Sequence, residues 1–115
     1  MSSEEDNGAD LGIVVETKKR TKLKRPRMFR VLMHNDDYTT RDFVVYVLQS
    51  IFHHGEGEAS RIMLHVHTSG VGVAGVFTRE IAETKVAKAQ RLSEQNGFPL
   101  RLSMEPESDD PGETS

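Results

Sequence analysis

The sequence contains no cysteine, and its longest apolar runs are only a few residues long. Without cysteine the chain can form neither disulfides nor a thiolate metal site, and it has no cysteine nucleophile. The apolar runs are far shorter than the ~18 residues that a membrane-spanning helix needs. The opening residues MSSEEDNGAD are acidic and lack the apolar stretch of a secretory signal. We therefore expect a cytoplasmic protein that makes no contact with a membrane.

An excess of positive charge is also absent, since the formal net charge of the 115 residues is −3. The charges are instead sorted along the chain, with five acids and no base in residues 1–16, and eight bases and no acid in residues 17–30. The basic run has no aromatic residue before Phe29, which favours a solvated linker over a nucleic-acid site.

Both ends of the chain are rich in Ser, Gly, Pro and acidic residues and poor in large apolar side chains. Such a composition cannot bury enough surface to offset the entropy lost on ordering, so it is typical of disordered segments. We expect three parts: a disordered arm over residues 1–26, one folded domain over 27–105 and a disordered acidic tail over 106–115.

Apolar spacing and turn residues predict six elements in the folded part. The cluster Asn35-Asp36-Asp37 is typical of a turn, and the Thr39 hydroxyl is expected to cap the helix that follows, with Asp42 three residues on. Gly70 is expected to end the second helix, and two glycines in the second strand indicate a close backbone approach or a sheet edge. Strands are expected at 28–34, 71–77 and 100–105, and helices at 39–51, 58–68 and 79–95.

This β-α-α-β-α-β order predicts an α+β fold, a small three-stranded antiparallel sheet with helices packed on one face. The turn between the first strand and the first helix carries two carboxylates and an amide. These side chains are common turn formers, and they are also hydrogen-bond acceptors that could converge on an ammonium group. Met63, Val66 and His67 share one face of the second helix, where they either belong to the core or line an apolar cavity with a polar rim.

No metal site or enzyme motif is evident. His65 and His67 point apart on a helix, as do the neighbours His53 and His54, and there is no His-Glu-x-x-His motif. The glycines at 70, 72 and 75 match a GxGxxG pattern but lie before and within a strand, so they do not form a phosphate loop. We expect no metal, no cofactor and no catalysis.

Three segments of the folded part carry a specific combination of residues. They are Asn35-Asp36-Asp37-Tyr38-Thr39 with Phe43-Val44, then Met63-Leu64-x-Val66-His67, then Gly75-Val76-Phe77-Thr78-x-Glu80-x-Ala82-Glu83-Thr84-Lys85-Val86. Together they resemble the ClpS family, the adaptors that deliver N-degron substrates to the Clp ATP-dependent protease. The resemblance covers essentially all of the folded part, and it implies a βααβαβ domain behind a flexible arm, without catalysis or a cofactor.

The resemblance also implies a site for the first residue of a substrate. The free α-amino group would be held by Asn35, Asp36 and His67, and a first side chain of Leu, Phe, Tyr or Trp would enter an apolar pocket. The positions that match the pocket and its rim are Asp37, Thr39, Arg41, Val44, Val47, Met63, Val66 and Leu100.

The family resemblance extends to partners. A monomeric adaptor is expected to dock on the N-terminal domain of a ClpA-type AAA+ unfoldase through a surface that matches Glu80, Glu83, Thr84 and Lys85. The arm, residues 1–26, matches the segment that the unfoldase engages during handover. We assign no role to the acidic tail.

Two residues depart from the family pattern, since Thr40 and Arg41 stand where many members have Pro and Met. That Met helps to close the pocket and to exclude β-branched residues. Arg41 is long and charged, so it could repel the ammonium group or contact the carbonyls of the peptide. The resemblance therefore does not fix which first residues this chain accepts.

Two other interpretations remain. The same βααβαβ outline resembles the C-terminal domain of the ribosomal stalk protein, an interaction domain that lacks the Asn-Asp-Asp…His set. A small acid–base enzyme could use His67 and Asp36 as base and orienting carboxylate. The enzyme would turn over a substrate, whereas the adaptor would only bind one stoichiometrically.

Overall fold

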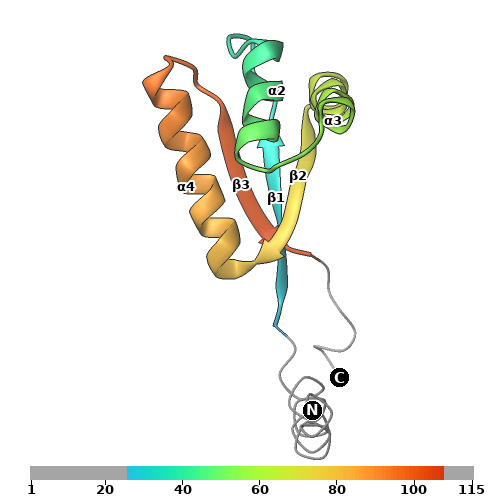
Figure 1. Ribbon diagram of the computed structural model, residues 1–115, viewed down its shortest axis with the longest axis vertical. Coiled ribbons are helices and arrows are strands. Elements are labelled where there is room, and N and C mark those ends of the chain that lie inside the picture. The colour runs from blue at the N-terminus through green and yellow to red at the C-terminus, as the bar shows by residue number, and fades with distance from the viewer. Residues whose placement is uncertain (1–25, 108–115) are drawn as a thin grey trace, which may run out of the picture.

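The computed structural model describes residues 26–107, and its elements follow the predicted order (Figure 1). The α+β class and the βααβαβ order are therefore confirmed. Nearly all of the predicted arm and tail lie outside the described residues. The elements are β1 (Met28–His34), α2 (Arg41–Ser50), α3 (Glu56–Ser69), β2 (Val71–Thr78), α4 (Arg79–Gln95) and β3 (Arg101–Pro106).

The last strand extends one residue further than predicted, into the expected tail. It runs through Pro106, and the amide of Glu107 donates a hydrogen bond to the Met28 carbonyl at 2.8 Å. Pairing of β3 with β1 therefore continues to Met28, the first residue of β1.

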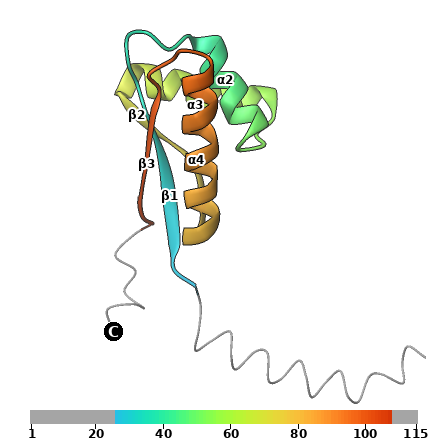
Figure 2. The same cartoon turned by 90° about the vertical axis from the view of Figure 1, so that its left-hand side faces the viewer.

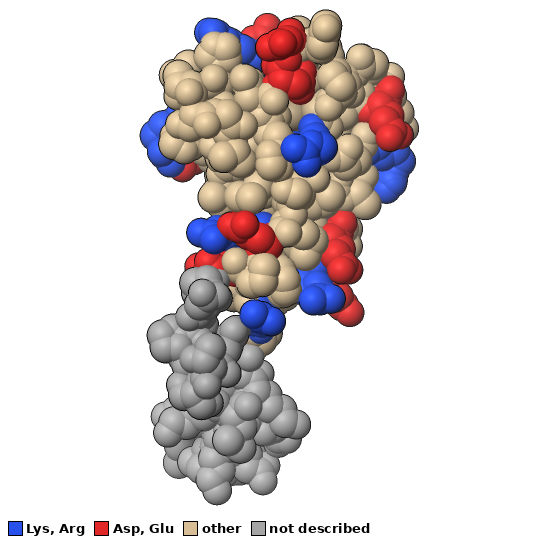
Figure 3. All heavy atoms as spheres, turned by 180° about the vertical axis from the view of Figure 1, so that it is seen from behind, with Lys and Arg blue, Asp and Glu red and all other residues tan. Residues whose placement is uncertain are grey.

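The sheet is antiparallel with the strand order β2-β1-β3, so β1 lies in the centre. Phe29, Val31 and Met33 of β1 are buried, and the residues between them are partly exposed. Figure 2 shows α2 and α4 together on one side of the sheet. The opposite face, seen from behind in Figure 3, carries few charges over its upper part. One covered face explains the alternation along β1.

Helix α2 begins one residue later than the sequence predicts. Its N-cap is Thr40, whose hydroxyl accepts a hydrogen bond from the Phe43 amide at 3.1 Å. The prediction of Thr39 as the cap is wrong, because its hydroxyl donates to the Asp36 carboxylate at 2.8 Å instead. Either of the two adjacent threonines can cap a helix through its hydroxyl group. Thr40 does so here because the Thr39 hydroxyl is bonded to Asp36.

Helix α3 begins at Glu56, two residues before the predicted start, and ends at Gly70 as predicted. Gly70 has a φ of 92°, the left-handed conformation that a glycine adopts easily at this position. Gly72 lies close under α3, since a Cβ built on it would be 2.7 Å from Cγ2 of Val66. The predicted close approach is thus confirmed, and it lets α3 pack against β2. In the described part of the chain, no helix is long and apolar enough to span a membrane.

Candidate functional site

The loop from β1 to α2 is organised around the Asp36 carboxylate. Its Oδ1 accepts hydrogen bonds from the amides of Tyr38 and Thr39 at 2.8 and 2.7 Å, and its Oδ2 accepts one from the Thr39 hydroxyl. The start of the loop is held by the backbone N–H of Asn35, which donates a hydrogen bond to the Gly70 carbonyl at 2.9 Å. The loop therefore has a defined shape beside the end of α3.

These contacts keep Asp36 ionised. Burial alone would raise the pKa of this carboxyl group, but the hydrogen bonds from Thr39 and Tyr38 outweigh it, and the pKa is lowered. Hydrogen bonds donated to a carboxylate stabilise its charged form. The Asp36 carboxylate therefore places a negative charge in this loop.

A cavity of about 390 Å³ opens between this loop, the first turns of α2, and α3. Most of the residues predicted for the amine site and the pocket line it, although they come from segments almost 30 residues apart in the sequence. Tyr38 and Thr40 also line the cavity and were not predicted. The predicted residues that line it are Asn35, Asp36, Asp37, Thr39, Arg41, Val44, Met63, Val66 and His67.

Two predicted wall residues are not among those that line the cavity. Val47 is 0% exposed and Leu100 is 2% exposed, and both belong to the hydrophobic core. Val47 lies almost one helical turn after Val44 on α2, and it is fully buried whereas Val44 borders the cavity.

The wall and the rim of the cavity differ in chemistry. Val44 and Val66 are buried and Met63 is half-buried, so the wall is apolar. Asp36, Asp37 and His67 lie among the lining residues and supply polar groups. Such a combination suits a ligand that has an apolar side chain beside a charged group. Of the two interpretations of the α3 face, the cavity is the one that the structure shows.

Arg41 crosses the mouth of the cavity from α2 to α3. Its Nη2 lies 2.8 Å from Nε2 of His67. Because a guanidinium group only donates hydrogen bonds, Nε2 must be the acceptor, and the imidazole must be neutral in this contact. Sequence reasoning missed the pair, since the two residues are 26 positions apart and belong to different predicted helices.

The predicted docking residues all lie on α4 but have different surroundings. Glu80, Glu83 and Thr84 are exposed. Lys85 is half-buried, and its Nζ donates to the Ile51 carbonyl at 2.8 Å and lies 5.3 Å from the centre of the Phe77 ring. Lys85 therefore also connects α4 to the end of α2.

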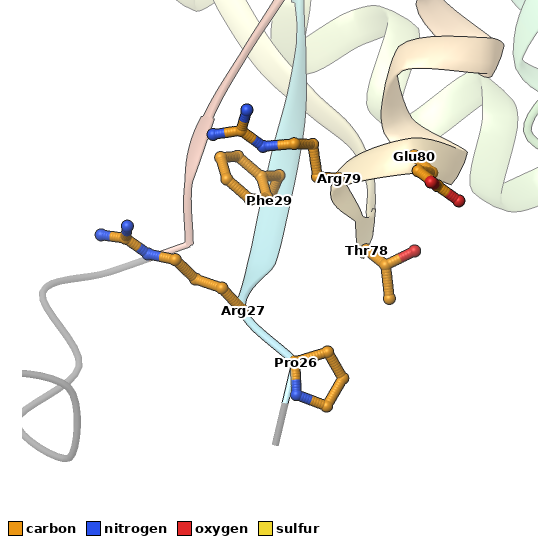
Figure 4. Close-up of a pocket in the computed structure, with 6 residues that line it drawn as sticks. All are labelled: Pro26, Arg27, Phe29, Thr78, Arg79 and Glu80. Atoms are coloured by element: carbon orange, nitrogen blue, oxygen red, sulfur yellow. The ribbon is translucent and has the colours of Figure 1, made fainter. Parts of the chain in front are cut away.

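A second hollow of about 320 Å³ lies beside the start of α4 (Figure 4). The guanidinium of Arg79 lies over the Phe29 ring, 5.1 Å from its centre, and Glu80 projects to the other side of the helix start. Of the predicted docking residues, Glu80 is also among those that line the hollow. The hollow is separate from the cavity between α2 and α3, with which it shares no lining residue.

Among the residues that the structure describes, no group of three or more His, Asp or Glu side chains could hold a metal ion. Asp36 and His67 are not paired with each other, because the Asp36 oxygens are hydrogen-bonded to Tyr38 and Thr39 and the His67 ring to Arg41. The base and orienting carboxylate of an acid–base enzyme are therefore not assembled here.

The sequence of the chain is similar to those of a known protein family. Residues 24–103 match the model of the family described as ATP-dependent Clp protease adaptor protein ClpS. The ClpS adapter protein of Myxococcus xanthus is 53% identical over 98 residues, which are 85% of this chain and 92% of the relative. That of Desulfatibacillum aliphaticivorans is 57% identical over 102 residues, 89% of this chain and 97% of the relative.

A solved structure is also similar. It is that of Agrobacterium tumefaciens ClpS2 bound to L-phenylalaninamide, with a TM-score of 0.70 and 43% sequence identity. The match covers 72% of this chain and 100% of the other. The ligand of that relative has a free α-amino group next to an aromatic side chain.

Proposed function

The chain belongs to the ClpS family of Clp protease adaptors, and from this we propose that it binds N-degron substrates and delivers them to a ClpA-type AAA+ unfoldase. The substrate would be recognised by its free α-amino group and its bulky first side chain. The role is binding, not catalysis. The proposal rests above all on one cavity that combines hydrogen-bond acceptors with an apolar wall.

The acceptors suit an ammonium group. An ammonium has three donors, and the Asn35 amide oxygen, the Asp36 carboxylate and the His67 Nε2 can each accept one. The carboxylate of Asp36 has about four acceptor positions, of which Tyr38 and Thr39 use three. One position remains for the substrate.

The apolar wall would select the first side chain. Val44, Met63 and Val66 offer surface for Leu, Phe, Tyr or Trp, and the flexible thioether of Met63 adapts to rings of different shape. The ClpS2 complex with L-phenylalaninamide supports this choice, because that ligand presents the same pair of groups. An internal residue or an acetylated N-terminus lacks the charge and would leave the polar rim unpaired.

Delivery would use two other parts of the molecule. We propose that Glu80, Glu83, Thr84 and Lys85 dock on the N-terminal domain of the unfoldase, and that residues 1–26 are engaged by it during handover. The adaptor would act as a monomer in the cytoplasm. Family membership removes the reason for the ribosomal-stalk interpretation.

The first test is fluorescence anisotropy with labelled peptides that begin with Leu, Phe, Tyr, Trp, Ile or Met, each with a free or an acetylated N-terminus. Free Leu and Phe peptides are expected to bind, and acetylation is expected to abolish binding. Asp36→Ala and His67→Ala should each weaken binding by roughly tenfold or more, since each removes a partner of a charged group.

His65→Ala serves as the control, because His65 is an exposed histidine of the same helix that does not line the cavity. Its peptide affinity should equal that of the unmodified chain. If no peptide with a free N-terminus binds, the proposed function is wrong.

A further inference from the structure

We propose that Arg41 is a specificity-determining residue that competes with the substrate for His67 and shifts the preference of the adaptor toward an acidic second residue. This inference rests on the proposed function. It is drawn from the contact of Arg41 with His67 at the mouth of the cavity.

The competition follows from the chemistry of a neutral imidazole. His67 has one lone pair that can accept a hydrogen bond in the plane of the ring, on Nε2 in the observed contact. The Arg41 guanidinium takes it at 2.8 Å. A substrate ammonium needs the same lone pair, so it can use His67 only after Arg41 has moved away.

The two cations also repel each other. A guanidinium and an ammonium that approach the same nitrogen lie within a few ångströms, where like charges oppose binding. Arg41 is exposed and lies in the first turn of α2, so its side chain can swing into solvent without breaking the core. The cost of binding is therefore the loss of one exposed hydrogen bond and not a rearrangement of the fold.

The displaced guanidinium then decides which substrates bind well. With the first side chain in the cavity and the amine at its rim, the second residue of the peptide lies at the mouth, beside Arg41. The other charged residues that line the cavity are Asp36 and Asp37. Without Arg41 these carboxylates would favour a basic second residue, whereas a guanidinium released at the mouth would pair with an acidic one.

The test compares the full-length chain with Arg41→Met and Arg41→Gln, using free peptides that begin Leu-Glu, Leu-Ser or Leu-Lys. Arg41→Met is expected to bind the Leu-Ser peptide roughly three- to tenfold more tightly, because an exposed hydrogen bond that competes with the substrate is worth about that factor. Arg41→Gln should gain less, because its amide carries no charge but can still donate to His67. The ratio of Leu-Glu affinity to Leu-Lys affinity should fall by a similar factor. Arg91→Met, an exposed arginine of α4 that does not line the cavity, should change neither quantity.

The nitrogen chemical shifts of the His67 ring give a second readout that does not depend on peptide. The Nε2 signal of the Arg41→Met variant should differ from that of the unmodified chain, because methionine donates no hydrogen bond to His67. Unchanged shifts, equal or weaker Leu-Ser binding by both variants, or an unchanged affinity ratio would overturn the inference while leaving the proposed function intact. Absence of binding to every free N-terminus, by the variants as well, would instead remove the proposed function and this inference with it.

Discussion

His34 and Asp36 lie two residues apart at the end of β1, and both have shifted pKa values for different reasons. His34 points to the sheet face opposite the helices, where its Nε2 lies 2.7 Å from the Ser103 hydroxyl. Burial, followed by the positive charge of Arg101, lowers the pKa of the His34 ring. The hydrogen bonds that Thr39 and Tyr38 donate lower the pKa of Asp36 despite its burial. Each residue therefore links folding to pH in its own range.

The free energy of unfolding is expected to fall in two steps as the pH decreases. A lowered histidine pKa means that the unfolded chain binds the proton more readily, so the His34 contribution is lost below about pH 6.5. The contribution of Asp36 is present above its unfolded pKa and is lost on acidification below about pH 4. Urea unfolding of His34→Gln should lack much of the first step, and that of Asp36→Asn much of the second. A variant that retains the full step would contradict the assignment.

At the scale of elements, the long side chain of Lys85 links α4 to the end of α2. Lys85 donates to the Ile51 carbonyl, and its ammonium lies 6.0 Å from the centre of the Phe52 ring and 5.3 Å from that of Phe77. The exposed Glu83 lies two residues earlier on the same helix. The predicted docking surface thus contains residues with and without a structural role.

This difference predicts separate effects of two substitutions. Lys85→Met should lower the free energy of unfolding by about 1–2 kcal/mol, because it removes a hydrogen bond and a cation–π contact. It should also weaken binding to the isolated N-terminal domain of the unfoldase. Glu83→Gln should weaken that binding at unchanged stability. Thermal unfolding and titration calorimetry measure the two quantities, and a loss of stability in Glu83→Gln would contradict the exposed position.

At the scale of the whole molecule, the proposed roles in substrate binding and in delivery fall on different parts of the chain. The described residues 26–107 contain the three-stranded sheet, the hydrophobic core and the residues that line the cavity. The cavity lies between α2 and α3, whereas the predicted docking surface lies on α4. We therefore expect peptide binding to depend on residues 35–67 and not on the predicted arm.

Deletion of residues 1–25 should consequently leave the peptide affinity within about twofold, since the residues that line the cavity all lie between Asn35 and His67. Delivery should fail, because the unfoldase would have no segment to engage. The assay is degradation of a reporter that begins with Leu by the unfoldase and its protease. A chain with a scrambled arm of equal length separates the effect of arm length from that of arm sequence. Degradation at the full rate by the truncated chain would contradict the proposed role.

Much of the site could be predicted because its residues are local signals in the sequence. The Asn-Asp-Asp turn follows a strand, and Met63, Val66 and His67 repeat at helical spacing. Thr39 was assigned wrongly because two adjacent threonines compete for one cap, and the neighbouring carboxylate decides between them. Val47 shows a different limit, since the family resemblance names it as a wall position, whereas the structure buries it in the core and not among the residues that line the cavity.

The sequence alone determined the order of the elements and the α+β class. It also determined which residues could supply the apolar wall of the cavity and which could supply its polar rim. These follow from spacing and from residue type, which act over a few neighbouring positions. Only the tertiary structure decided that α2 and α3 approach closely enough for Arg41 to donate to His67, and that Lys85 reaches the end of α2. Contacts of this kind depend on how helices pack over a sheet, with Gly72 allowing α3 to lie close to β2. Such packing joins residues whose separation along the chain carries no local signal.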